Sequence, residues 1–193
     1  MKHLAIFASG KGSNAENICR YFQNHKKIKV VCLFTDRKTS GSFEIAERFQ
    51  LPCIYLSKEM HAKPNLILSE LQSHQVHFII FAGYLKLMPA EIINIYKNHI
   101  VNIHPALLPK YGGKGMYGMN VHEAVCQAAE VETGITIHLV NEKYDEGEII
   151  FQKKTEVNKN DTPAMVAEKI HALEMEWFPK VIEDWVDREQ QKD

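Results

Sequence analysis

The sequence carries almost no net charge, and this excludes several classes of protein. Its 23 lysines and arginines nearly balance 24 aspartates and glutamates, so the formal net charge is -1. No overall field therefore draws the chain to nucleic acid or to an anionic membrane, although a local basic site could still bind a phosphate. No apolar run approaches the length that spans a bilayer, and the run before Ser9 is too short for a signal peptide. We expect a cytoplasmic protein.

Cysteine is also scarce, and its spacing argues against a zinc cluster. The four residues, Cys19, Cys32, Cys53 and Cys126, stand far apart without a CxxC pair. Such residues are more often reduced thiols in the core of a cytosolic protein. No internal repeat or low-complexity linker divides the chain, and 193 residues fit one domain of ordinary size. We therefore predict a single domain over residues 1–193.

The first half of the chain alternates short apolar runs with segments of helical period. This rhythm favours a parallel sheet covered by helices on both faces, which is an α/β fold of the Rossmann-like kind. The predicted elements are strand 3–8, helix 15–24, strand 29–34, helix 43–49, strand 53–56, helix 65–74 and strand 77–82.

The second half follows a different pattern. Apolar runs at 135–140 and 149–153 flank a polar turn at 142–147, and a connection this short suits an antiparallel pair. The sheet is thus expected to be mostly parallel with an antiparallel C-terminal part. Helical spacing predicts a long final helix from 162 to about 186, and we expect Pro179 to break or kink it.

A glycine-containing turn, Ser9-Gly10-Lys11-Gly12-Ser13-Asn14, follows the first predicted strand and opens a helix. Glycine lets the backbone turn tightly, and the free amides at a helix start can hold a phosphate or carboxylate. The turn is not a G-x-x-x-x-G-K-[ST] loop, and it lacks the last glycine of the G-x-G-x-x-G fingerprint. On the turn alone, anion binding and an ordinary capped turn stay equally open.

Asn102 and His104 stand two residues apart at the end of a β-rich run that Pro105 terminates. The period of a strand places both side chains on the same side, at the carboxyl edge where α/β sheets bind ligands. An amide that donates a hydrogen bond beside an imidazole that donates a proton suits a developing oxyanion. The alternative is a structural histidine at a strand end, which the adjoining asparagine disfavours.

Two loops supply further candidates. Asp145, in the polar turn, is the carboxylate that could orient His104 and favour its charged form, although turn chemistry alone also explains Asp-Glu-Gly. The glycine-rich segment 107–118 is either a flexible surface loop or a mobile flap over a substrate. His122 and His138 could also lie near the site, but for both we expect structural roles.

Four segments together resemble the glycinamide ribonucleotide transformylases, also called phosphoribosylglycinamide formyltransferases. The Asn-x-His-Pro-x-Leu-Leu-Pro stretch with a downstream Asp is specific to folate-dependent formyltransferases, and a turn ending Gly-Ser-Asn points to the ribonucleotide-using branch. The matching segments follow the family's order and span most of the chain: 9–14, 81–88, 101–111 and 133–147.

The resemblance implies a formyltransferase of de novo purine biosynthesis and one-carbon metabolism. It would transfer the formyl group of 10-formyltetrahydrofolate to the amine of glycinamide ribonucleotide, without a metal, as a monomer or homodimer. Residues 1–100 would form the nucleotide- and phosphate-binding half, and residues 101–193 the catalytic and folate-binding half. The implied catalytic residues are Asn102, His104 and Asp145, the substrate-binding residues Gly12, Ser13, Asn14 and Glu174, and the folate-binding residues Leu85, Lys86, Leu87, Met88, Asn141, Glu142, Lys143 and Tyr144.

The implied mechanism is direct transfer. The neutral amine attacks the formyl carbon, Asn102 and protonated His104 stabilise the tetrahedral oxyanion, and Asp145 positions His104. A bound water relays the proton to the departing folate nitrogen, and the bond between Leu108 and Pro109 is expected to be cis, as in relatives.

The chain departs from the family's pattern in two places. Between Tyr111 and His122 it is longer and richer in glycine, so no residue there is assigned a role. A basic family residue near position 63 has no clear counterpart, because Lys63 precedes Pro64.

Three other kinds of function stay open. A methionyl-tRNA formyltransferase or a formyltetrahydrofolate hydrolase would normally carry an added domain, which we do not expect here. A non-catalytic phosphate-binding module would need the glycine turn but have no use for Asn102, His104 and Asp145 together. A nucleotide-dependent dehydrogenase is suggested only by the α/β rhythm, and its glycine fingerprint is absent.

Overall fold

The computed structural model describes residues 1–190, whose strands form a single sheet of order β3-β2-β1-β4-β5-β6-β7. Strands β1 to β5 run parallel, β6 is antiparallel to β5, and β7 is antiparallel to β6. The predicted fold class is therefore confirmed, including its antiparallel part. The strands are β1 (Lys2–Phe7), β2 (Ile28–Thr35), β3 (Cys53–Tyr55), β4 (Phe78–Phe81), β5 (Ile100–His104), β6 (Glu132–Leu139) and β7 (Ile149–Glu156).

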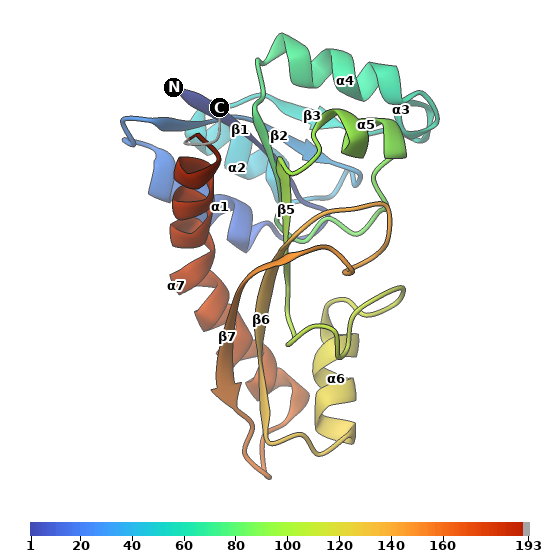
Figure 1. Cartoon of the computed structure of the whole chain (residues 1–193), viewed down its shortest axis with the longest axis vertical. Coiled ribbons are helices and arrows are strands. Elements are labelled where there is room, and N and C mark those ends of the chain that lie inside the picture. The colour runs from blue at the N-terminus through green and yellow to red at the C-terminus, as the bar shows by residue number, and fades with distance from the viewer. Residues whose placement is uncertain (191–193) are drawn as a thin grey trace.

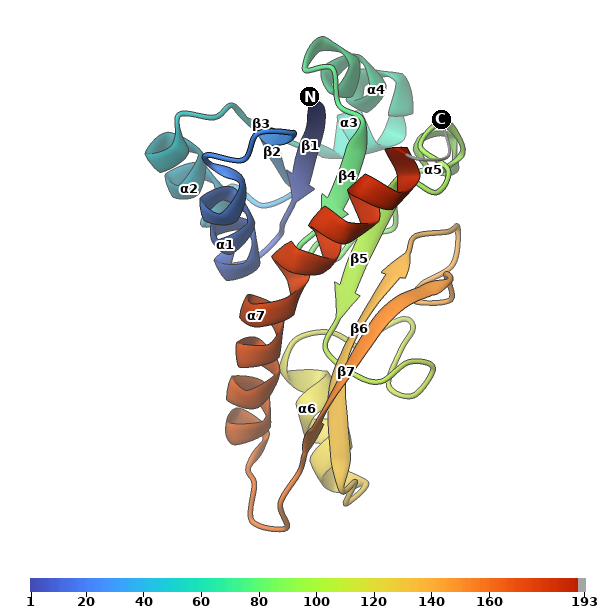
Figure 2. The same ribbon diagram turned by 60° about the vertical axis from the view of Figure 1, so that its left-hand side comes forward.

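Helices cover both faces of the sheet (Figures 1 and 2). One hydrophobic cluster joins the sheet to α1, α2 and α7, and a second joins its other face to α3, α4 and α5. The remaining helix, α6, packs against α7. The helices are α1 (Ser13–Phe22), α2 (Ser42–Phe49), α3 (Lys58–Ala62), α4 (Pro64–Ser73), α5 (Ala90–Ile95), α6 (Met119–Gln127) and α7 (Pro163–Gln190).

The central strand β1 shows why its sequence is apolar without interruption. Leu4 and Ile6 enter the first cluster, whereas Ala5 and Phe7 enter the second, and all four are fully buried. A parallel strand with helices on both sides has no face in contact with water, so every position favours an apolar residue.

Three helices were not predicted from the sequence. α3 and α5 have five and six residues, which is too short to establish a helical period. α6 begins at Met119 directly after Gly118, so the glycine-rich composition before it hides its start. Of the helices within residues 1–190, none is long and apolar enough to cross a membrane.

The cysteines are free thiols, and two of them lie in the core. Burial raises the pKa of Cys19 and of Cys32 to about 12, so both thiols stay protonated at neutral pH. Cys53 and Cys126 are only partly buried, so the expectation of core positions is correct for two of the four.

Pro179 does not break α7, which continues to Gln190, but the helix axis changes direction part-way along (Figure 2). A proline inside a helix cannot donate to the carbonyl four residues earlier. That carbonyl belongs to Met175, and it accepts a hydrogen bond from Asn17 Nδ2 at 2.8 Å. Because Asn17 of α1 replaces the missing donor, the helix tolerates its proline. Of the two predicted outcomes, a break is therefore excluded, and α7 bends part-way along its length (Figure 2).

This contact gives a test of stability. Asn17→Ala should lower the free energy of unfolding by about 1–3 kcal/mol, because the part-buried Met175 carbonyl loses its donor. Urea unfolding followed by circular dichroism measures the change. The control Gln23→Ala, at the exposed end of the same helix, should stay within about 0.5 kcal/mol of the unmodified protein. Equal stability of the two variants would contradict the role given to Asn17.

Candidate active site

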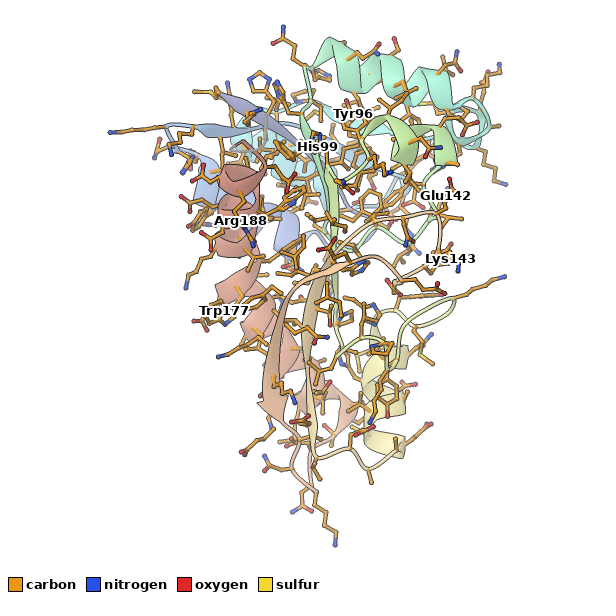
Figure 3. The ribbon with its side chains drawn as sticks, in the orientation of Figure 1. Tyr96, His99, Glu142, Lys143, Trp177 and Arg188 are labelled. Atoms are coloured by element: carbon orange, nitrogen blue, oxygen red, sulfur yellow. The ribbon has the colours of Figure 1, made fainter. Side chains whose placement is uncertain are left out.

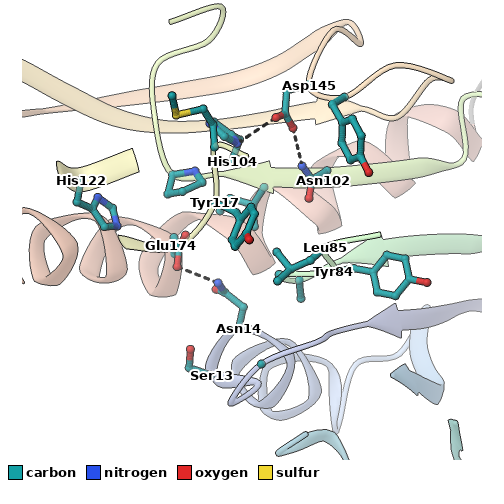
Figure 4. Close-up of a pocket in the computed structure, with 18 of the residues that line it drawn as sticks. Ser13, Asn14, Tyr84, Leu85, Asn102, His104, Tyr117, His122, Asp145 and Glu174 are labelled. Carbon is teal, nitrogen blue, oxygen red and sulfur yellow. Dashed lines mark hydrogen bonds and ion pairs between the residues drawn. The ribbon is translucent and has the colours of Figure 1, made fainter. Parts of the chain in front are cut away.

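A cleft of about 600 Å³ opens at the carboxyl ends of β1, β4 and β5. It is lined by the glycine turn after β1, by 82–85 after β4, by 102–105 at the end of β5, by flap residues 113–118, and by Glu174 of α7. Figure 4 shows these segments facing one another around the cleft. The parallel part of the sheet thus brings together segments that lie far apart in the sequence.

The glycine turn shapes one end of the cleft. Gly12 has a left-handed backbone (φ 82°), and a Cβ there would lie 2.5 Å from Ile45 Cδ1, so the position favours glycine. The turn leads directly into α1, and Gly10 to Asn14 all line the cleft. A helix start presents unpaired backbone N–H groups and a partial positive charge, which favour an anion.

Asn14 and Glu174 meet across the same end of the cleft, although 160 residues separate them. Asn14 Nδ2 donates a hydrogen bond to Glu174 Oε2 at 2.8 Å (Figure 4). Asn14 Oδ1 is buried without a partner among residues 1–190. Burial raises the pKa of Glu174, and Asn14 and His171 oppose that shift only in part. Asn14 and Glu174, two of the four predicted substrate-binding residues, therefore line the cleft as a pair, and Asn14 Oδ1 is left to accept a hydrogen bond.

Asn102, His104 and Asp145 come together at the other end. Asn102 and His104 leave β5 on the same side, and Asp145 reaches them from the turn between β6 and β7 (Figure 4). Asp145 Oδ2 lies 3.5 Å from His104 Nδ1, and its Oδ1 lies 3.4 Å from Asn102 Nδ2. The side chain of His104 is 4% exposed and that of Asp145 is 12% exposed. The three residues thus form one polar cluster, in which His104 is buried and Asn102 and Asp145 are half-buried.

The polar turn at 142–147, called the acidic turn below, has a backbone geometry that places Asp145 in this position. Asp145 has a left-handed backbone (φ 56°), which aspartate tolerates better than most residues. Gly147 follows where a Cβ would lie 1.6 Å from the Leu139 carbonyl oxygen, so only glycine fits. Gly113 N donates a hydrogen bond to Asp145 Oδ2 at 2.9 Å, which fixes the carboxylate from the flap side.

Burial and local partners have opposite effects on the pKa of His104 and on the pKa of Asp145. Burial lowers the pKa of His104, and the Asp145 carboxylate and the Tyr111 carbonyl oppose this without overcoming it. Burial alone would raise the pKa of Asp145, but the hydrogen bond to His138, the charge of His104 and the Gly113 amide together hold it below its usual range. Asp145 is therefore ionised at neutral pH, and a protonated His104 is a stronger acid than histidine in water.

His138 is a member of the cluster that the sequence analysis did not select. It lies opposite Asn102 in the antiparallel register of β5 and β6. Its Nδ1 donates to the Leu139 carbonyl at 2.8 Å, and its Nε2 lies 3.1 Å from Asn102 Nδ2 and 3.5 Å from Asp145 Oδ1. The signal was the β-strand period that puts Thr136 and His138 on one face, but identifying the contact also required the strand register.

His122 of α6 also lines the cleft. Its Nδ1 is buried and has no hydrogen-bond partner within the described part of the chain. Burial, and then the charge of nearby His104, lower the pKa of His122. Two histidines expected to be structural thus lie at the site.

Most of the predicted folate-binding residues surround a second, smaller cavity of about 60 Å³. It shares Asn102 and Asp145 with the larger cleft, so the polar cluster stands between the two. Leu85 lines the larger cleft instead. Glu142 lines neither of these two cavities and is exposed at the edge of the molecule (Figure 3). The predicted residues that line the smaller cavity are Lys86, Leu87, Met88, Asn141, Lys143 and Tyr144.

Lys63 borders neither cavity and pairs with Glu59 at 2.9 Å on an exposed helix face. The bond between Leu108 and Pro109 is cis, as the resemblance implied.

Comparison with known proteins shows the family of the chain. The formyl transferase family model matches residues 2–182. The phosphoribosylglycinamide formyltransferase of Bacillus subtilis is 35% identical over 187 residues, covering 94% of this chain and 93% of that protein. The chain belongs to the phosphoribosylglycinamide formyltransferase family. The chloroplastic phosphoribosylglycinamide formyltransferase of Arabidopsis thaliana is 38% identical over 94% of this chain.

The chain spans only 64% and 60% of the Arabidopsis and Vigna unguiculata relatives, both named chloroplastic. Solved structures of the family are similar along almost their whole length. Glycinamide ribonucleotide transformylase 1 from Geobacillus kaustophilus has a TM-score of 0.85 at 33% identity, covering 94% of this chain and 96% of that one. The phosphoribosylglycinamide formyltransferase from Bacillus halodurans has a TM-score of 0.85 at 31% identity, with 95% and 94% covered. The sequence-based family prediction is confirmed.

The contact between the two ionisable groups can be tested directly. Asp145→Asn should lower the pKa of His104 further, because the carboxylate that favours the imidazolium is lost while asparagine still tolerates the left-handed backbone. A pH titration of the His104 ring nitrogens by NMR measures the shift. Glu146→Gln, which removes an exposed carboxylate one residue away, is the control and should leave the titration unchanged. A His104 pKa that stays in place in Asp145→Asn would show that the two groups do not interact.

Proposed function

We propose that this protein transfers the formyl group of 10-formyltetrahydrofolate to the amine of glycinamide ribonucleotide, a step of de novo purine biosynthesis. The observation that carries the proposal is the cleft, in which the glycine turn at the start of α1 and the Asn102, His104 and Asp145 cluster lie at one sheet edge. A binding module would use the turn but would not need the cluster. The family supplies the identity of the donor and acceptor.

The substrate would lie along the cleft. Its phosphate would bind the backbone amides of Gly12, Ser13 and Asn14, where the start of α1 favours an anion. Glu174, held by Asn14, would accept a hydrogen bond from the ribose or glycinamide portion. This anchoring directs the amine toward the end of β5, where the cluster lies.

The folate would enter on the side of the smaller cavity. Leu85, Leu87 and Met88 would offer apolar contacts, and main-chain groups of 141–144 would bind the polar edge of the pterin. Asn102 and Asp145 border both spaces, so the formyl carbon would reach the amine beside them. Glu142 is the weakest member of the predicted set, because its side chain is exposed outside the two cavities.

In the reaction, the amine nitrogen attacks the formyl carbon and the carbonyl oxygen takes the negative charge. The Asn102 amide and the protonated His104 ring would stabilise this oxyanion. The present bond from Asn102 Nδ2 to Asp145 is 3.4 Å, which is long for a hydrogen bond, so an oxyanion could compete for that N–H. The amine then loses a proton, the carbon–nitrogen bond to folate breaks, and the folate nitrogen gains a proton through a bound water.

Asp145 would act on His104 in this scheme. Its carboxylate opposes the lowering of the His104 pKa by burial and so favours the protonated ring that would stabilise the oxyanion. We propose two small-molecule substrates, a monomeric or homodimeric state, and a cytoplasmic location.

The catalytic roles are tested by rate. Asp145→Asn and His104→Ala should each reduce kcat by on the order of 100-fold or more while KM for both substrates changes little, because they act on the transition state. The assay follows deformylated folate spectroscopically with 10-formyltetrahydrofolate and glycinamide ribonucleotide. Undiminished turnover in either variant would reject its role. Deformylation without any amine would favour a hydrolase instead.

The substrate-binding end is tested by affinity. Asn14→Ala should raise KM for glycinamide ribonucleotide by about tenfold, roughly the worth of one or two hydrogen bonds, with a smaller change in kcat. A substrate lacking the phosphate provides the control: the unmodified protein should bind it weakly, and Asn14→Ala should weaken it less than the phosphorylated substrate. If KM for glycinamide ribonucleotide is unchanged, Asn14 does not contact it.

A further inference from the structure

The base of the flap, residues 111–113, contacts both members of the His104 and Asp145 pair. His104 Nε2 donates a hydrogen bond to the Tyr111 carbonyl at 2.7 Å, and Gly113 N donates to Asp145 Oδ2 at 2.9 Å. The carbonyl can only accept, so Nε2 must carry a proton and Nδ1 is the nitrogen that faces Asp145. The backbone of this short segment therefore sets which ring nitrogen is available to the reaction.

Tyr111 holds this carbonyl in an unfavourable backbone conformation. Its φ is 56°, in the left-handed region that non-glycine residues rarely adopt. Such a conformation persists only where surrounding contacts enforce it. One such contact is the hydrogen bond that the Tyr111 hydroxyl donates to Glu130 Oε1 at 2.8 Å. Lys110 Nζ donates to the same oxygen at 2.8 Å.

Two further hydrogen bonds anchor the chain before Tyr111, both of them at Leu108. Leu108 N donates to Thr136 Oγ1 at 3.0 Å, and Gln152 Nε2 donates to the Leu108 carbonyl at 3.0 Å. Beyond that point Tyr111 borders a cavity of about 280 Å³, which also touches Glu130 and Gln152 but not His104. Because open space adjoins the ring, packing alone does not fix the Tyr111 side chain. Its hydrogen bond to Glu130 is therefore needed to hold it in place.

We propose that Tyr111, anchored by Glu130 in the connection between α6 and β6, is a positioning residue for His104. The tyrosine–glutamate bond holds the Tyr111 carbonyl against Nε2 and so fixes the tautomer and orientation of the ring. The inference rests on the proposed function for its kinetic consequence. Neither side chain touches the substrates; both act through the backbone carbonyl.

The titratable groups facing His104 come from three other elements. Asp145 approaches from the β6–β7 turn, His138 from β6 and His122 from α6. None of the three is bonded to the Tyr111 hydroxyl, whose partner is Glu130. Loss of that hydroxyl therefore changes the His104 environment through the Tyr111 carbonyl and not through a neighbouring charge.

Tyr111→Phe tests the proposal by removing only the hydroxyl. We expect kcat to fall about five- to tenfold, the effect of one lost hydrogen bond, with both KM values within about twofold. The pKa of His104, followed by NMR, should fall because the carbonyl that favours its protonated form is held less firmly. Unchanged kcat together with an unchanged His104 titration would overturn the proposal.

Matched variants separate positioning from general damage. Glu130→Ala should reproduce Tyr111→Phe, the double variant should add no further loss, and Glu130→Gln should restore most of kcat because its amide oxygen still accepts from the hydroxyl. Tyr21→Phe, which removes another tyrosine–glutamate bond far along α1, should leave kcat and the titration unchanged. Equal effects of Tyr21→Phe and Tyr111→Phe would mean that the loss is not specific to His104.

The two proposals can fail separately. The His104 titration needs no substrate, so it tests the Tyr111 anchor even if the unmodified protein does not formylate glycinamide ribonucleotide. If the unmodified protein is active as a transferase but the His104 pKa is unchanged in Tyr111→Phe, only the proposed Tyr111 anchor is rejected.

Discussion

The buried carboxylate of Asp145 is the constraint on which the rest of the site depends. A charge that is 12% exposed is costly unless it is paired and hydrogen-bonded. Its partners come from three parts of the chain: β5 gives Asn102 and His104, β6 gives His138, and the flap base gives the Gly113 amide. Satisfying one carboxylate therefore fixes the acidic turn, the flap base and the sheet edge relative to one another.

The reversal of strand direction at β6 explains why that turn needs such unusual backbone geometry. β6 leaves the sheet beside the start of β5, because Val140 N bonds to the Ile100 carbonyl. The chain must then fold back along β5 to bring Asp145 to Asn102. A left-handed aspartate and a glycine with no room for a Cβ allow this return within a few residues. The sequence left turn chemistry and a role beside His104 as alternatives for Asp-Glu-Gly, and the same backbone geometry serves the turn and places Asp145 beside His104.

The features that could be predicted from the sequence are those that depend on the spacing of residues along a single strand or helix. The alternation of buried runs and helices predicted the sheet, and the two-residue spacing of Asn102 and His104 placed them together. The contact of His138 with Asn102 depends on the register of two strands, and that of His104 with Tyr111 on a backbone carbonyl, which no side-chain pattern reveals. Pro179 was expected to break or kink α7, and it does not break the helix because a donor 158 residues away in sequence replaces the missing one.

That distant donor also connects stability to substrate binding. Asn14 and Asn17 lie three positions apart on α1, so they project from one face of the helix toward α7. Asn17 bonds the Met175 carbonyl that Pro179 leaves free, and Asn14 bonds the side chain of the preceding residue, Glu174. The bend in α7 and its docking on α1 therefore place Glu174 in the cleft. Asn17, which stabilises the fold, thus helps to position Glu174, which is proposed to bind the substrate. Changes at the contact between α1 and α7 should therefore affect stability and substrate binding together.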